Sequence, residues 1–117
     1  MCTNVNYFTF RELLKTQTGF FNEPSSPSAL ANLSSLWDYL NSLRQELGQP
    51  IVVNSAFRTE QVNKQVGGAK RSLHIQGRAA DIRTSPLYMD ELWKLLQADR
   101  DNLSELIHKG TYIHFAL

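Results

Sequence analysis

Apolar side chains recur at steps of three and four residues between positions 27 and 47, a spacing that predicts a long amphipathic helix. Ser26 followed by Pro27 is typical of a helix start, and Gly48 is typical of a helix end. A stripe of this kind could bind a partner, but it packs into the core far more often. The repeating positions are Leu30, Leu33, Leu36, Trp37, Leu40, Leu43 and Leu47.

Three shorter helices are predicted from capping residues. Thr9 and Glu12 have the spacing of a capping box, and Thr59 and Ser85 each stand where a helix cap is expected. The helices are expected over about 10–15, over 60–66 with Gly67-Gly68 as its end, and from Pro86 onward with Met89, Leu92, Trp93 and Leu96 on its apolar side.

Short strands follow the long helix. The runs 50–54 and 79–82 have the composition of strands, and the chain closes with a predicted hairpin of 105–108 and 111–115. A two-residue turn at Lys109-Gly110 would join the two strands of this hairpin. Because helices lead and strands close the chain, we expect an α+β fold, a small antiparallel sheet with helices packed on it.

Length and composition narrow the class of protein. A chain of 117 residues favours a single domain over 1–117, and 42% hydrophobic with 20% charged residues is ordinary for a globular protein. A net charge of +1 gives no argument for a nucleic-acid or anionic-membrane partner, and we expect a monomer. Cys2 is the single cysteine, so no internal disulfide can form.

The sequence says little about where the protein works. The stretch from Met1 to Phe10 lacks the basic and apolar regions of a secretory signal. No run approaches the roughly 20 apolar residues of a membrane span. We therefore expect cytoplasmic synthesis with possible release by lysis, although a mature form recorded without its leader would look the same.

The chemistry is concentrated in a stretch that ends at Asp81. His74 and Asp81 stand seven residues apart with Gly77 between them, and His114 lies on the last predicted strand. If the strands that carry Asp81 and His114 are neighbours, the two side chains can share one face of the sheet. Two histidines and one carboxylate leave a coordination position open for water, as catalytic zinc requires.

Each of these residues also has an ordinary structural interpretation. His74 could lie on the surface, Asp81 could cap a helix or pair with a cation, and His114 could belong to the core. Taken singly, such residues are more often structural than metal ligands. A protein without a metal, acting in signalling or assembly, would hold the three side chains more than about 8 Å apart, because zinc ligands lie about 2 Å from the ion.

A resemblance to a known family favours the metal site. The sequence matches each fixed position of the Ser-x-His-x-x-Gly-x-Ala-x-Asp motif of the zinc D-Ala-D-Ala metallopeptidases, at Ser72, His74, Gly77, Ala79 and Asp81. That family includes D,D-carboxypeptidases, D,D-dipeptidases and the L-Ala-D-Glu endopeptidases of phage lysins. Further segments resemble other family elements between about Ile51 and His114, namely Ser55-Ala56-Phe57-Arg58, Val62-Asn63-Lys64, Val66-Gly67-Gly68 and Tyr112-Ile113-His114.

The resemblance implies a fold, a reaction and a set of site residues. The fold would be of the hedgehog or D,D-peptidase type, with His74, Asp81 and His114 as zinc ligands. The protein would hydrolyse peptidoglycan stem peptides through a metal-activated water, as a D,D-carboxypeptidase or an endopeptidase. Arg58 would bind substrate, and a permanent planar cation suits a peptide carboxylate or a developing oxyanion. Without the resemblance, Arg58 would be an ordinary surface arginine near a helix start.

Two further residues are candidates for the substrate site. Ser72 could hydrogen-bond substrate or a metal ligand, or it could shape the turn before His74. Tyr112 would share the face of His114 and could line the pocket, although burial is the commoner fate of such an aromatic side chain.

The general base departs from the family pattern. The family usually carries an acidic residue three positions before the last histidine, and compact relatives carry one five positions before it. This chain has Thr111 and Lys109 there. A two-residue turn would pair residue 105 with residue 114, so Glu105 could serve as base or could orient His114. Glu105 could equally face solvent, and His108 is expected on the opposite face.

These departures leave a second function open. A non-catalytic module of the same fold could bind cell-wall peptide or hold zinc structurally, and Thr111 and Lys109 are the features that favour it.

Overall fold

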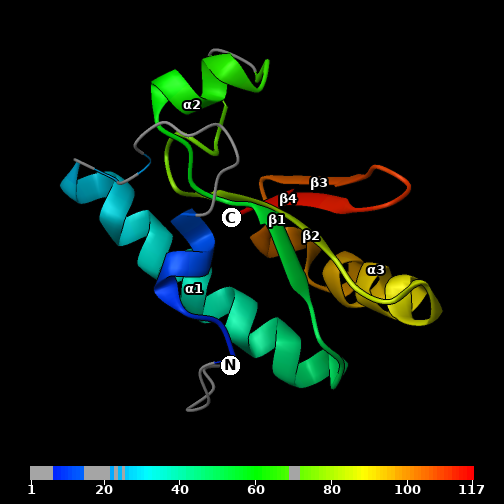
Figure 1. Ribbon diagram of the computed structural model, residues 1–117. Coiled ribbons are helices and arrows are strands. Elements are labelled where there is room, and N and C mark those ends of the chain that lie inside the picture. The colour runs from blue at the N-terminus through cyan, green and yellow to red at the C-terminus, as the bar shows by residue number, and fades with distance from the viewer. Residues whose placement is uncertain (1–6, 15–21, 23, 25, 69–71) are drawn as a thin grey trace.

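The fold is a four-stranded antiparallel sheet with two helices packed on one of its faces (Figure 1). The computed structural model describes residues 7–14, 22, 24, 26–68 and 72–117, so Cys2 lies outside the described residues. The sheet has the order β1-β2-β4-β3, and the predicted α+β class is confirmed. The strands are β1 (Val52–Ser55), β2 (Ala79–Arg83), β3 (Glu105–His108) and β4 (Ile113–Ala116).

The long helix α1 (Pro27–Leu47) forms as its sequence pattern predicts. The Ser26 hydroxyl accepts a hydrogen bond from the backbone N–H of Ala29, and Gly48 ends the helix with φ of 71°. The pattern predicted that Leu30 joins the core, but its side chain is 46% exposed. The buried positions of the predicted stripe are Leu33, Leu36, Leu40, Leu43 and Leu47.

Helix α3 (Met89–Ala98) completes the covered face of the sheet. A single 3-10 turn (Pro86–Tyr88) precedes it, so the predicted start at Ser85-Pro86 is a turn rather than α-helix. Leu92 and Leu96 are fully buried against α1 and the sheet. The sheet contributes Val53, Ala80, Ile82, Ile113 and Phe115 to the same core.

Three short helical segments complete the described chain, and one of them is the 3-10 helix Arg100–Asn102 after α3. Thr9 and Glu12 cap the 3-10 helix Phe10–Leu14 reciprocally, as the capping box predicts. Helix α2 (Glu60–Gln65) begins at Thr59, whose hydroxyl accepts a hydrogen bond from the N–H of Val62. In Figure 1, α2 lies at the top of the molecule, away from α3 and from the C-terminal end of α1. Among the described residues, no helix is long and apolar enough to cross a membrane.

Strand alternation gives the sheet an apolar face and a polar face. Ile82 of β2 and Ile113 of β4 point toward the helices. Their neighbours Asp81 and His114 therefore point to the other face, because successive side chains of a strand alternate. In each central strand, every second side chain is thus buried against the helices, and the side chains between them face the other side, where they can form a functional site.

The closing hairpin differs in register from the prediction. Residue 107, not residue 105, pairs with His114, and four residues (109–112) connect the strands. A two-residue turn of the common type needs positive φ at both central positions, and a lysine at 109 disfavours that. Gly110, with φ of 90°, is the residue of the loop with positive φ. The shift is two residues, so Glu105 stays on the predicted face.

Gly77 is required where the chain enters β2. Its φ is 75°, and a Cβ at this position would lie 2.6 Å from the carbonyl oxygen of Ala29 in α1. Gly48 has a similar φ of 71° but faces open space. The two glycines therefore separate the effect of backbone conformation from the effect of close packing.

We predict that Gly77→Ala lowers the free energy of unfolding more than Gly48→Ala does. The Gly48 variant should lose about 1 kcal/mol, because alanine disfavours left-handed backbone. The Gly77 variant should lose about 3 kcal/mol, because a clash with α1 adds to that strain. Urea unfolding of the two variants measures both values, and equal losses would contradict the close approach of α1 to Gly77.

Candidate metal site

Three side chains that could bind a metal ion meet on the polar face of the sheet. His74, Asp81 and His114 each offer one ligand atom, and these atoms lie within 4.8 Å of one another. Asp81 and His114 are directly paired across β2 and β4, as expected for neighbouring strands. His74 arrives from the loop before β2. This convergence removes the basis for the metal-free alternative, which required the side chains to lie far apart.

The loop that carries His74 is held by hydrogen bonds from both sides. The Nδ1–H of the buried His74 donates to the carbonyl of Ala56 at 2.6 Å. The hydroxyl of Ser72 accepts from the backbone N–H of His74, which is the turn role considered for this serine. Because a carbonyl can only accept, the neutral His74 ring keeps Nε2 unprotonated. Nε2 faces Asp81 Oδ1 at 3.4 Å.

His114 lies between two carboxylates. Its Nδ1 is 2.8 Å from Asp81 Oδ1, and its Nε2 is 2.8 Å from Glu105 Oε1. The hydrogen bond to Asp81 raises the pKa of His114 above its ordinary value, burial opposes the rise, and Glu105 adds to it. Burial favours the neutral form of Asp81, but the hydrogen bond from His114 outweighs it and holds the pKa of Asp81 well below its ordinary value.

This arrangement suits a divalent cation. Asp81 is held ionised, and an unprotonated nitrogen of His74 faces the same carboxylate oxygen as Nδ1 of His114. A metal at this point would replace the Nδ1 proton of His114, in the way that metal binding generally displaces protons. The partners Ala56 and Glu105, on the far sides of the two rings, are the kind that orient metal-binding histidines.

Arg58 stands beside the three candidate ligands. One of its terminal nitrogens lies 3.5 Å from Asp81 Oδ2, and its side chain is 15% exposed. Burial lowers the pKa of Arg58 from its ordinary value, and the charge of Asp81 opposes the change. The guanidinium remains a cation at neutral pH.

An open cleft of about 440 Å³ contains these groups. Ser72 and Tyr112, predicted as substrate-binding residues, both line it. Lys109 also lines the cleft, whereas Thr111 is exposed in the loop and is not among the lining residues. A second cavity of about 510 Å³ lies between α1 and α3, far from this chemistry.

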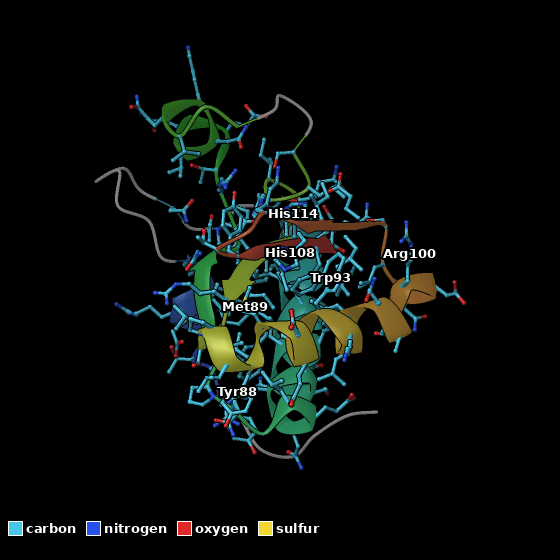
Figure 2. All side chains as sticks on the ribbon, turned by 90° about the vertical axis from the view of Figure 1, so that its right-hand side faces the viewer. Tyr88, Met89, Trp93, Arg100, His108 and His114 are labelled. Atoms are coloured by element: carbon cyan, nitrogen blue, oxygen red, sulfur yellow. The ribbon has the colours of Figure 1, made fainter. Side chains whose placement is uncertain are left out.

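His108 lies off the site, as predicted. Figure 2 shows His108 on the side of the sheet that faces α3, near Trp93, and His114 on the opposite side. The rings of His108 and Trp93 are 5.1 Å apart in an edge arrangement. The difference follows from strand parity, because His108 pairs with Ile113 of the core face.

Several residues of the site were not identified from the sequence. The carbonyl of Ala56 could not be recognised as a partner of His74, because any residue supplies a carbonyl. Ile107 lines the cleft and pairs with His114, the position that the predicted register assigned to Glu105. Ser55 and Asn63 accept hydrogen bonds from Arg58. Asn63 belongs to the segment Val62-Asn63-Lys64, which resembles a family element but to which the sequence assigned no role.

Comparisons with known proteins agree with the class of site that the geometry defines. The family model described as peptidase M15 matches residues 6–116. A zinc D-Ala-D-Ala carboxypeptidase of Streptomyces albus G is 40% identical over 84 residues, which cover 69% of this chain and 32% of that protein. The chain thus spans about a third of the length of this relative.

The fold and the three converging ligands define a candidate metal-dependent hydrolase. The chain belongs to the peptidase M15 family. The family predicted from the sequence motifs is therefore confirmed. The expected zinc cofactor agrees with the family, with the name of the relative and with the cluster of His74, Asp81 and His114.

We predict that the metal-free protein holds His74 as the tautomer with the proton on Nδ1. The carbonyl of Ala56 fixes this proton, and Nε2 is left for the ion. Nitrogen-15 NMR of the imidazole rings at slightly alkaline pH should show Nδ1 protonated and Nε2 bare. A spectrum with the proton on Nε2 would contradict the arrangement.

Proposed function

We propose that this chain is a zinc-dependent peptidase that hydrolyses peptidoglycan stem peptides, with His74, Asp81 and His114 as the zinc ligands. The observation that carries the proposal is the convergence of three ligand atoms within 4.8 Å in an open cleft. Zinc, when bound, supplies a Lewis acid that lowers the pKa of a coordinated water to about 7 and polarises a carbonyl. Membership of the peptidase M15 family supports the same reaction.

The substrate is proposed to end in D-Ala-D-Ala or to contain an L-Ala-D-Glu bond. The first alternative has support in the name of the relative, a zinc D-Ala-D-Ala carboxypeptidase. Arg58 would donate hydrogen bonds to a carboxylate of the peptide or to the charge that develops on the carbonyl oxygen. Ser72 and Tyr112, on the wall of the cleft, would contact the peptide with their hydroxyl groups.

Glu105 is proposed to have two roles, one for each carboxylate oxygen. Oε1 accepts a hydrogen bond from His114 Nε2 and fixes the orientation of that ring. Oε2 has no partner among the described residues, and the side chain lines the cleft and is 43% exposed. This oxygen would take the proton from the attacking water.

A second candidate function is a non-catalytic module that binds wall peptide. Two observations favour this module. Thr111 and Lys109 stand at positions where relatives carry acidic residues, and Lys109 brings a positive charge to the cleft. Asp81 and Glu105 are the acidic residues among the described side chains that line the cleft. Turnover therefore depends on Glu105 in this proposal.

A monomeric state, the lack of nucleic-acid or membrane partners and cytoplasmic synthesis stay predictions.

We predict about one zinc ion per chain in the purified protein, retained in His108→Ala and lost in His114→Ala. The two histidines lie on opposite faces of the same hairpin, so His108→Ala is a matched control for His114→Ala. Elemental analysis after dialysis against zinc gives the content. Zinc bound equally by all three proteins would show that the metal lies elsewhere.

The Glu105 variants distinguish an enzyme from a binding module. Glu105→Gln keeps an acceptor for His114, so zinc should stay bound while hydrolysis falls about 10²- to 10⁴-fold, as for loss of a general base. Glu105→Ala should in addition weaken zinc binding about 10- to 100-fold. Peptides ending in D-Ala-D-Ala and peptides with L-Ala-D-Glu are the substrates to assay.

Full activity in Glu105→Gln would limit Glu105 to orienting His114. Peptide binding by the zinc-loaded wild type without hydrolysis of either substrate would favour the binding module. Hydrolysis that survives a chelator would contradict the proposed function altogether.

A further inference from the structure

The Arg58 guanidinium is held at three points by three different elements. Its Nε donates to the hydroxyl of Ser55 at 3.2 Å, and one terminal nitrogen donates to Asn63 Oδ1 at 3.3 Å. The other terminal nitrogen lies 3.5 Å from Asp81 Oδ2. An arginine has five N–H groups, and among the described residues the other two have no acceptor. These two groups are available to a ligand in the cleft.

Asn63 is a buried polar residue on the far side of Arg58 from Asp81. It lies on α2 and is 4% exposed, and few polar side chains in the described part of the chain are buried to this degree. Charge-assisted hydrogen bonds between arginine and a carboxylate are commonly about 2.7–2.9 Å long. The longer 3.5 Å separation from Asp81 is what we expect if Ser55 and Asn63 hold the guanidinium back. The carboxylate of Asp81 then remains available to a metal ion.

Gly68 leaves the space that this contact needs. A Cβ at position 68 would lie 2.0 Å from Asn63 Oδ1 and 3.1 Å from a terminal nitrogen of Arg58. The backbone N–H of Gly68 donates to the carbonyl of Asn63 at 2.9 Å, which fixes the two residues together. Gly68 is not among the glycines with positive φ, so space rather than backbone conformation requires a glycine here.

We propose that Asn63 and Gly68 are positioning residues for Arg58, and that they hold its guanidinium ready for a peptide carboxylate. This inference rests on the proposed peptidase function. Asn63 acts through Arg58 and not on the substrate itself. An arginine that is already ordered loses less conformational freedom when substrate binds, so the pair lowers KM for carboxylate-ended peptides.

The kinetic test uses the zinc-loaded protein and a peptide ending in D-Ala-D-Ala. Asn63→Leu and Gly68→Ala should each raise KM about tenfold, the factor expected when one long side chain must be ordered on binding. Zinc content should not change, and Asn63→Asp, which keeps the acceptor, should restore KM. The exposed Gln65→Ala on the same helix is the control and should behave like the wild type.

A double-mutant cycle separates positioning from a merely structural role. In an Arg58→Ala background, neither Asn63→Leu nor Gly68→Ala should change KM further, because the group that they position is gone. The same tenfold rise in that background would overturn the proposal. Gly68→Ala does not remove the Asn63 side chain but displaces it from Arg58, so the test survives even if Asn63→Leu does not fold.

A second readout does not depend on activity. In nitrogen-15 NMR of the zinc-loaded wild type, Arg58 should give a sharp Nε–H signal, assigned by its loss in Arg58→Lys. Asn63→Leu and Gly68→Ala should speed exchange of this proton with water at least about tenfold, and Gln65→Ala should not. Unchanged exchange in both variants would overturn the inference. A wild type without hydrolysis would contradict the proposed function, and the exchange rates would still decide the positioning role.

Discussion

The pairing of β2 with β4 is the contact on which the site depends. Asp81 and His114 are 33 residues apart in the sequence, and the direct pairing of these two positions brings carboxylate and imidazole within 2.8 Å. His74 depends on the same sheet, because its ring is fixed by the carbonyl of Ala56, which directly follows β1. The register of three neighbouring strands therefore sets the geometry of all three candidate ligands.

Strand alternation allows one small sheet to serve both stability and chemistry. Ile82, Ile113 and Phe115 are fully buried against the helices, and the residues between them form the site. Ala79 and Ala116 share the face of Asp81 and His114 and are also fully buried. A slip of one residue in either strand would exchange the two faces.

The charges of the site form an alternating chain. Arg58 approaches Asp81, Asp81 approaches His114, and His114 approaches Glu105, so each partly buried charge has a partner of opposite sign. Such pairing offsets the desolvation of the groups, which is severe for an isolated buried charge. A bound cation would take over the charge that the proton of His114 supplies here. Asn63 and Ser55 accept hydrogen bonds from Arg58 and so order its guanidinium at the end of this chain of charges.

The sequence by itself determined the class of fold, the ends of the main helices, the family and the three candidate ligands. These features depend on local signals, such as caps, apolar spacing and a dense motif between Ser72 and Asp81. The tertiary structure decided the hairpin register, the exposure of Leu30 and the partners of His74 and Arg58. Those features depend on contacts between distant segments and on space for a Cβ, which residue types along a chain do not encode locally.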